Sequence, residues 1–484
     1  MRKFLKIDTF KIVAAFLIPA IFVLLSVQVI DNDSWGVLAE GREIVNGGIY
    51  RTDVLSMHEG LNTVLQNYLF AVPFYYIFQI FGGPGIYAVM LLLNFLICFF
   101  LYKICMLISG KNRGMSLALM MATDIMLALL GFVTTRAQMV SFVIFLSFIY
   151  VLELYVKNGK AKILFLLPVF SVLQANLHAS LWWMLLAVLI TFIIDAPKKK
   201  PLLLAGLGFL LAGLINPYGI GMLTLIFKAY SDSTFASMVQ ELQPFSPLRN
   251  TGNALFYIAF SGVVIAYAFS KRKNVRLRYL LMLFGFLTLG LNTVKGLSQV
   301  VLVMFFPLAL LFKDIRIGKI IDSSDCKKAI SLWAGVLTAV IFAVICPVVV
   351  LNVPSDYTGA VKDATDVIDS YVKDGDKKAL KVYTGYNIGG YVEYRGYRPY
   401  MDPRGADFIK KLNGKEDIFN EYNELQNGKI DVNNFVNKYH FDYIYAVGEN
   451  DPFYEFKNDG YTEIFHDEEM QVKVYKMLDK NLKV

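Results

Sequence analysis

Long apolar segments separated by short polar connections make up most of this chain, and they restrict its fold more than any other feature. A bilayer core of about 30 Å is crossed by about 20 apolar residues in a helix. The composition, 56% hydrophobic with a mean hydropathy of +0.50, lies outside the range of soluble globular proteins. We therefore predict a polytopic α-helical membrane protein with about 11 spans, at roughly 10–30, 84–108, 115–133, 139–156, 163–178, 180–194, 202–215, 255–269, 280–294, 299–312 and 329–350.

The polar connections are of two kinds, which differ in positive charge. If the N-terminus is inside, the inner connections and their flanks carry about 23 Lys and Arg residues and the outer ones about 6. Because Lys and Arg favour the cytoplasmic side, we predict a cytoplasmic N-terminus and, after the last span, an outer C-terminus. Counting residues 67–81 as a further span would place Lys198–Lys200 outside. We instead interpret residues 67–81 as an interfacial or re-entrant helix that ends at Gly82-Gly83-Pro84.

Several classes of function are excluded by what the sequence contains. The net charge of +8 comes from residues that face anionic lipid, so it does not indicate a nucleic-acid partner. The chain has no Walker loop, GxSxG elbow, dinucleotide fingerprint or His/Cys metal spacing, and ATP hydrolysis is not indicated. Its four cysteines all lie before residue 354, so no disulfide framework is predicted for the C-terminal part.

The composition changes near residue 354, where apolar segments give way to mixed, charged patterns. The remaining residues include 18 Lys and Arg and 24 Asp and Glu. We predict a transmembrane domain at 1–353, with a large first outer loop at 31–83, and a small extracytoplasmic α/β domain at 354–484. In this domain we expect helices near 361–372, 405–412, 416–426 and 431–439, and strands near 381–384, 391–394, 398–401, 441–447, 462–465 and 471–476.

The first outer loop holds the best candidates for acid–base chemistry. Asp31 and Asp33 precede a helix-like stretch at 34–46, whose apolar residues fall on one side and which we expect to lie on the outer bilayer surface. Asp33 would suit the N-cap of this helix. Two carboxylates at this spacing next to a membrane could also hold a divalent cation or act as a base. Asp53 follows in the same loop.

Polar residues also stand at the outer ends of other spans. An ionisable group at a membrane boundary is costly unless it faces a cavity or a partner. Arg136 and Lys295 could instead extend to lipid phosphates, and His178 could be a hydrogen-bonded packing residue. Together these groups predict a polar cavity at the outer face that binds substrate, formed by Arg136, Gln138, Asn176, His178, Glu241 and Lys295.

The C-terminal domain has one dense polar motif. Gly389-Gly390 allows close backbone approach, and Asp402-Pro403-Arg404 can make a fixed ion pair. A structural turn with a buried salt bridge is one interpretation. The other is that Asp402 and Arg404, with neighbouring tyrosines, recognise a sugar or a phosphate head group.

Short motifs recur in one order over nearly the whole chain: Asp33-Ser34-Trp35, Arg51-Thr52-Asp53, Arg136-Ala137-Gln138, Asn176-Leu177-His178, Asn216-Pro217-Tyr218-Gly219, Gly389-Gly390-Tyr391 and Asp402-Pro403-Arg404. In this series the chain resembles bacterial multi-pass envelope proteins grouped with GT-C-type glycosyltransferases, which take sugars from polyprenyl-phosphate carriers. The resemblance implies a membrane glycosyltransferase with a first-loop acid acting as base or metal ligand. It also implies cationic residues that hold the carrier phosphate.

On this interpretation Asp33 is the general base on an acceptor hydroxyl, supported by Asp31 or Asp53. A divalent cation, Mg or Mn, at Asp31 and Asp33 is the alternative role for these acids. Arg136, His178 and Lys295 would stabilise the departing polyprenyl phosphate. The expected partners are membrane lipid, a polyprenyl-phosphate-linked sugar and a glycan or protein acceptor, with no nucleic acid.

Two other functions remain open. A non-catalytic envelope protein could keep the same scaffold to bind a lipid-linked glycan or a partner. It is favoured by Gly36, Val37 and Asn67, at positions where the resemblance leads us to expect polar or acidic residues. A transporter or flippase would need charged or broken helices near the bilayer midplane, for which Asp124 is the clearest candidate.

Overall fold

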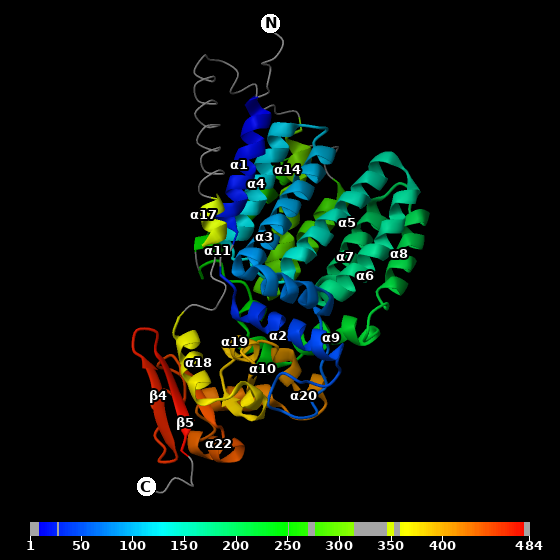
Figure 1. Cartoon of the computed structure of the whole chain (residues 1–484). Coiled ribbons are helices and arrows are strands. Elements are labelled where there is room, and N and C mark those ends of the chain that lie inside the picture. Colours follow the sequence, from blue (N-terminus) through cyan, green and yellow to red (C-terminus); the bar gives the residue numbers. More distant parts are fainter. Residues whose placement is uncertain are drawn as a thin grey trace. The chain divides into compact units, whose positions relative to one another are not determined.

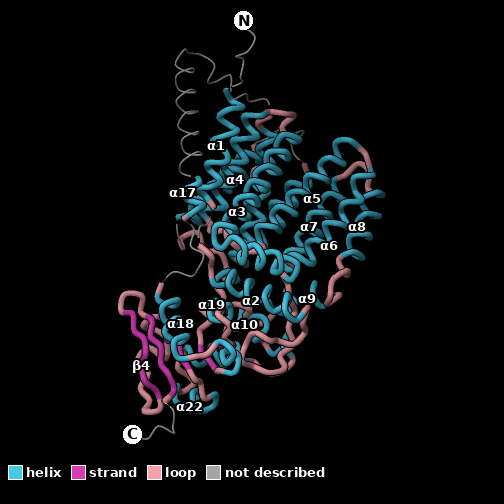
Figure 2. Tube along the Cα trace, in the orientation of Figure 1, coloured by secondary structure: helices cyan, strands magenta, loops and turns pink. Residues whose placement is uncertain are grey.

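The computed structural model describes residues 9–26, 29–249, 251–269, 276–313, 346–352 and 359–478. These residues form mostly helices and one five-stranded sheet (Figures 1 and 2). The chain divides into two compact units. Unit 1 comprises Met1–Gln28, Ile86–Asn216 and Glu241–Val353, and unit 2 comprises Val29–Gly85, Pro217–Gln240 and Pro354–Val484. The first outer loop is therefore grouped with the C-terminal residues and not with the apolar helices.

Unit 1 is built from apolar helices, and each segment predicted as a span between residues 10 and 312 overlaps one or two of them. The predicted span at 329–350 lies outside the described residues except at its end. The helices are α1 (Thr9–Leu25), the later part of α3 (Tyr68–Ile108), α4 (Arg113–Leu129), α5 (Gln138–Asn158), α6 (Leu166–Leu177), α7 (Trp182–Asp195), α8 (Lys200–Ala212), α11 (Thr251–Ala268), α12 (Leu277–Asn292), α13 (Leu297–Met304), α14 (Phe306–Leu311) and α17 (Cys346–Leu351).

Three helical stretches among the described residues are long and apolar enough to cross a membrane: Tyr68–Ile108, Gln138–Asn158 and Val294–Leu311. Six further apolar helices have only 10–17 residues. The predicted helical hairpin at 163–194 is confirmed, because α6 ends at Leu177 and α7 begins at Trp182 after the short 3-10 helix η2 (Ala179–Leu181). A membrane protein rich in apolar helices agrees with these findings.

Buried polar residues lie between the helices of unit 1. Arg278, at the start of α12, donates to Glu153 of α5 (2.9 Å) and to Asp195 at the end of α7 (2.7 Å). This ion-pair network ties the three helices together at one end. Asp124 is buried in α4, close to Cys98 and Asn94 of α3.

The helix α3 is interrupted where the sequence predicts an end. Gly82 has φ 61° and ψ −153°, a conformation that only glycine adopts readily, and it separates an apolar helix starting at Tyr68 from the one that continues to Ile108. The predicted end of the first helix at Gly82-Gly83-Pro84 is confirmed. Its location at the membrane interface stays a prediction.

Unit 2 contains a mixed sheet, which confirms the α/β character of the C-terminal part. The strand order is β2-β1-β3-β5-β4, with β1 parallel to β2 and β3, and β5 antiparallel to β3 and β4. The helix α18 (Ala360–Tyr371) lies alongside β4 and β5 (Figure 1). The strands are β1 (Lys381–Tyr383), β2 (Arg398–Pro399), β3 (Tyr443–Val447), β4 (Tyr461–Asp467) and β5 (Val472–Met477).

Most of the elements predicted for this part are found, with two differences. Residues 391–394, predicted as a strand, belong to the helix α19 (Gly389–Tyr394), so that prediction was wrong. The predicted helix at 405–412 is divided into the 3-10 helix η8 (Gly405–Phe408) and α20 (Lys410–Asn413). The helices α21 (Ile418–Gln426) and α22 (Val432–Tyr439) are as expected.

The amphipathic stretch predicted in the first outer loop forms α2 (Asn32–Gly47), and much of its apolar side is buried. Trp35, Leu38 and Glu40 are all buried, and Ile44 packs with the apolar residues Leu65 and Ala71, whereas Val45 is 37% exposed. The position of this helix on a bilayer surface stays a prediction. Close contact with α19 is possible because a side chain at Gly390 would collide with the backbone of α2.

Candidate functional site

Two clusters of charged side chains stand out, one in each unit. The Glu241 cluster, in unit 1, consists of Arg136, His178, Glu241 and Lys295. The Arg404 cluster, in unit 2, consists of Glu40, Asp53, Glu393, Asp402, Arg404 and Asp407. All four residues of the first cluster, and three of the second, are among the residues predicted from the sequence.

In the Glu241 cluster two cations share one carboxylate. Arg136 Nη1 lies 2.7 Å from Glu241 Oε1, and Lys295 Nζ lies 3.2 Å from Glu241 Oε2. Lys295 and then Arg136 outweigh the effect of burial and lower the pKa of Glu241 to about 2. The glutamate side chain is 42% exposed and each cation 29%, so all three groups can be reached from outside the unit.

The connections that carry these residues are held by backbone hydrogen bonds. Glu241 lies in the 3-10 helix η3 (Gln240–Leu242) and Lys295 in the 3-10 helix η5 (Val294–Gly296). The Val294 amide donates to the Gln243 carbonyl (3.0 Å), which joins the two connections. Arg136 stands in the turn just before α5. Three separate connections thus converge on one ionic cluster.

His178 lies in the turn between α6 and η2, and both of its ring nitrogens are engaged. Nδ1 is 2.8 Å from Ser141 Oγ, and Nε2 is 2.8 Å from Ser180 Oγ. Burial and then the charge of Lys295 lower the pKa of His178 to about 3, although Glu241 opposes them. The imidazole is therefore neutral at physiological pH, and it adds hydrogen-bonding capacity but no positive charge to the cluster.

The two predicted amides differ in their surroundings. Gln138 is the first residue of α5, and its buried Nε2 has no hydrogen-bond partner among the described residues. Asn176 donates through Nδ2 to the carbonyls of Val172 (2.6 Å) and Ile215 (2.9 Å), which joins the end of α6 to the segment after α8. A substrate-binding role for either amide stays a prediction.

In the Arg404 cluster one guanidinium is surrounded by carboxylates. Nη1 lies 2.6 Å from Asp53 Oδ1 and 3.4 Å from Asp407 Oδ2, and Nη2 lies 3.1 Å from Glu393 Oε1. Asp402 accepts from Nη2 (2.6 Å) and from Nε (3.1 Å). Because arginine has five N–H donors, every donor is used, and the predicted Asp402–Arg404 ion pair is confirmed.

Burial controls protonation in this cluster. It raises the pKa of Glu40 to about 8 and that of Asp407 to about 7, although Arg404 opposes both shifts. It also raises the pKa of Glu393 well above the usual range. Burial acts in the same direction on Asp53, but Arg404 and hydrogen bonds from Ser56 outweigh it and lower the pKa. The cluster therefore retains protons at neutral pH, since one guanidinium cannot neutralise five carboxylates.

The Arg404 cluster connects three segments of unit 2: the loop that carries Asp53, the helix α19 and the turn at Asp402. Asp53 also accepts hydrogen bonds from the Leu55 and Ser56 amides and from Ser56 Oγ (2.5 Å), so both of its oxygens are occupied. These contacts hold the three segments together, so we describe the Arg404 cluster as a structural junction. Recognition of a sugar by Asp402 and Arg404, and a catalytic role of Asp53, stay predictions.

The two acids at the start of the first loop have different positions. Asp31 is the N-cap of α2 and accepts hydrogen bonds from the Ser34 amide (2.9 Å) and Ser34 Oγ (2.6 Å), whereas Asp33 stands in the first helical turn. The cap is thus Asp31, and the interpretation of Asp33 as the N-cap was wrong. No group of three or more His, Cys, Asp or Glu residues in the described part of the chain is arranged to hold a metal ion.

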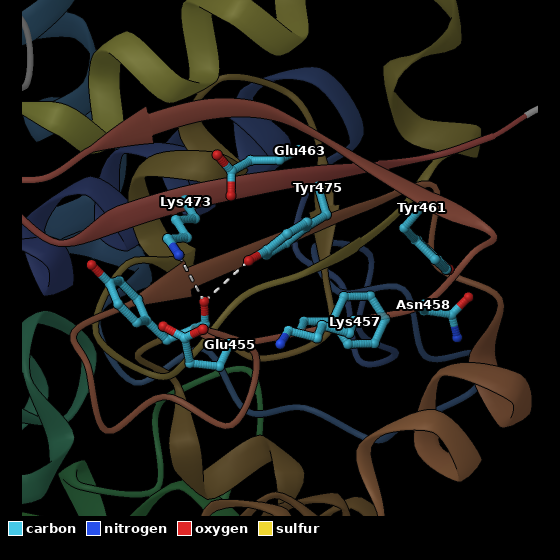
Figure 3. A pocket seen from close by; sticks show the side chains of 9 residues that line it. Glu455, Lys457, Asn458, Tyr461, Glu463, Lys473 and Tyr475 are labelled. Carbon is cyan, nitrogen blue, oxygen red and sulfur yellow. Dashed lines mark hydrogen bonds between the residues drawn. The ribbon is translucent and has the colours of Figure 1, made fainter.

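A polar pocket in unit 2 was not anticipated from the sequence. It has a volume of about 320 Å³ and lies beside β4, β5 and residues 454–458 (Figure 3). Lys473 Nζ and the Tyr475 hydroxyl both donate to the Tyr454 carbonyl at 3.1 Å, so they hold one wall of the pocket in place. No member of the Arg404 cluster lines it.

Sequence reasoning missed Glu40, Glu393 and Asp407. Glu40 falls in the helix that we expect on a bilayer surface and Glu393 in the strand expected at 391–394, and both are buried. The cluster joins segments about 350 positions apart in the chain, as the Arg404–Asp53 and Asp407–Thr63 hydrogen bonds show. A single sequence contains no signal for such pairing.

Comparison with known proteins gives no match: no protein-family model fits the chain, and no curated protein is similar to it. The resemblance to GT-C-type glycosyltransferases therefore depends on the motifs alone.

Proposed function

We propose that the chain is an integral membrane glycosyltransferase of the GT-C type, which moves a sugar from a polyprenyl-phosphate carrier to an acceptor at the outer face of the membrane. The proposal includes about 11 spans and an extracytoplasmic C-terminal domain, as the charge distribution predicts. The observation that carries it is the Glu241 cluster, in which Arg136 and Lys295 converge at the ends of apolar helices.

The chemistry of the carrier explains why two such cations are useful. When the acceptor oxygen bonds to the anomeric carbon, the bond from that carbon to the phosphate oxygen breaks, and polyprenyl phosphate leaves with increased negative charge. Arg136 and Lys295 stabilise this charge, because their shared partner Glu241 offsets only one of the two positive charges. The polyprenyl tail remains in the bilayer beside the apolar helices.

The acceptor hydroxyl must lose its proton in the same step. Asp53 is committed to Arg404, and Asp31 caps α2. We assign the proton to Asp33, which is partly exposed in the first turn of α2. General-base catalysis of this kind raises the reaction rate by about 10²–10⁴-fold.

Transfer of labelled sugar from polyprenyl-phosphate donors, measured in membranes that contain the full chain, tests the proposal. Asp33→Asn is expected to lower the rate by about 10²–10⁴-fold, and Arg136→Ala by about 10²–10³-fold. Arg113→Ala is the matched control, because Arg113 is an exposed arginine at the start of α4. If the wild type transfers sugar and both site variants transfer it at the same rate, the mechanism is wrong.

A second candidate is a non-catalytic envelope protein that binds a lipid-linked glycan. It is supported by the Arg404 cluster, where two of the predicted functional acids, Asp53 and Asp402, serve as buried partners of one arginine. The same assay separates the two candidates. Donor binding that depends on Arg136, without transfer over a broad panel of donor sugars, would favour the binding protein.

A further inference from the structure

A pocket with two lysines in its lining lies in unit 1, where α5 ends and the 3-10 helix η1 (Ala161–Phe165) begins. Its volume is about 320 Å³. Lys160 and Lys162 are exposed, and the ammonium group of neither makes a hydrogen bond or an ion pair within the described residues. The remaining lining is mainly apolar, and the full set is Leu154, Asn158, Lys160, Lys162, Ile163 and Phe165.

The surroundings of this pocket carry uncompensated positive charge. Lys157 is in the last turn of α5, and Lys198–Lys200 precede or begin α8, which packs against η1. The Tyr155 hydroxyl donates to the Lys198 carbonyl (2.8 Å) and holds this second basic segment to α5.

Acidic residues do not offset this charge. Between residues 138 and 212 the sequence has two acids, Glu153 and Asp195. Both are bonded to Arg278, at 2.9 and 2.7 Å. The two lysines therefore favour an anionic ligand for the pocket.

An apolar strip leads away from the pocket along α6. Phe165, Val169 and Leu173 are spaced four residues apart, so they lie on one side of the helix. Their exposed fractions are 69%, 45% and 36%. An acyl chain that follows this side would cover the strip while its head group stays beside Lys160 and Lys162.

We propose that this pocket binds one anionic phospholipid, with the phosphodiester between Lys160 and Lys162 and an acyl chain against Phe165, Val169 and Leu173. Basic pockets between membrane helices suit the head groups of anionic lipids, and the predicted inner location of Lys160 and Lys162 faces the leaflet that is rich in them. The proposal requires only that these helices lie in a bilayer, and it does not depend on the glycosyltransferase activity.

Native mass spectrometry of the full-length protein, titrated with phosphatidylglycerol or with phosphatidylcholine of the same chains, tests this site. The wild type is expected to bind phosphatidylglycerol in preference. Because a lysine near the membrane surface is worth about 1 kcal/mol toward an anionic lipid, K160Q/K162Q is expected to weaken the first binding event by roughly 10- to 30-fold. Phe165→Ser is expected to weaken it about threefold, and glycerol phosphate is not expected to compete.

The matched control is K111Q/R113Q, which removes the same charge from another connection predicted on the inner side, where Lys111 and Arg113 are also exposed. It is expected to bind phosphatidylglycerol as the wild type does. Equal losses in the two double variants would show that only overall surface charge matters, and would overturn the proposal. Unchanged binding by K160Q/K162Q would overturn it as well, and so would full competition by glycerol phosphate, which would indicate a site for a free phosphate.

Discussion

The two ionic clusters are built on opposite plans. In the Arg404 cluster one cation bonds to four carboxyl groups, Arg404 is only 13% exposed, and all of its donors are used. In the Glu241 cluster one carboxylate meets two cations, and all three side chains are partly exposed. A saturated, buried cation has no capacity left for a ligand, whereas two exposed cations that share one carboxylate can accept another anion. The first arrangement therefore suits structure, and the second suits binding.

The largest expected effect comes from removing the buried cation. Arg404→Met leaves Asp53 and Asp402 without their cationic partner. Unpaired buried charges of this kind cost about 3–5 kcal/mol. We expect unit 2 to unfold at a much lower urea concentration, measured on the full-length protein by hydrogen exchange of α2 and α19. Arg395→Met is the control, because Arg395 pairs with the partly exposed Asp366 and Asp369. A loss no larger than that of the control would mean that the Arg404 cluster is not a structural junction.

The next effect is on the pH dependence of the free energy of unfolding. The Glu40 carboxyl ionises near 4.5 when unfolded and at about 8 in the folded chain, so between these values the folded state binds more protons. The stabilisation is complete below pH 4.5 and is lost as the pH rises through 8. Glu40→Gln should remove this part of the pH dependence, on the order of 1–3 kcal/mol between pH 5.5 and 8.5.

Urea unfolding of the full-length protein at the two pH values measures this change. Glu43→Gln, on the same helix but paired with Lys378, is the control and should keep the wild-type pH dependence. If stability rises with pH in the wild type, burial of Glu40 does not govern the cluster.

A smaller effect is expected in the Glu241 cluster, where a substitution should strengthen the binding of a ligand. Glu241→Gln removes the carboxylate that Arg136 and Lys295 share, so the two cations attract an added phosphate more strongly. Binding of a polyprenyl phosphate should tighten by roughly 5- to 10-fold at low salt, and less at high salt because mobile ions screen the charges. Equilibrium binding at two ionic strengths measures it. Weaker binding by this variant would mean that Glu241 is needed to hold the cations in place.

Much of the fold could be predicted because it depends on local patterns. Apolar segments in unit 1, the break at Gly82 and the five strands of unit 2 follow from periodicity and from glycine or proline at their ends. The helix α19 could not be predicted, because Gly389 and Gly390 are adapted to contact with other backbone segments and not to their neighbours in sequence.

The residues of the two clusters also differ in whether a local pattern in the sequence reveals them. Arg136, His178 and Lys295 were recognised because a charged or polar residue at the end of an apolar segment is conspicuous. Glu40 was not, because a glutamate among polar helix residues resembles an exposed one until the partner that buries it is known. Buried polar networks between distant segments are thus the part of a fold that a single sequence conceals best.

The smallest expected change in stability separates the two acids of the first loop. Asp31 caps α2 through Ser34, so Asp31→Ala should cost about 1 kcal/mol of stability and leave the chemistry of sugar transfer intact. Asp33→Ala should do the reverse, since a residue in the first helical turn contributes little to capping but is assigned the acceptor proton. Urea unfolding and labelled-sugar transfer, measured on both variants, give a two-way comparison. Loss of transfer in Asp31→Ala with retention in Asp33→Ala would exchange the two roles, and would place the base at the cap itself.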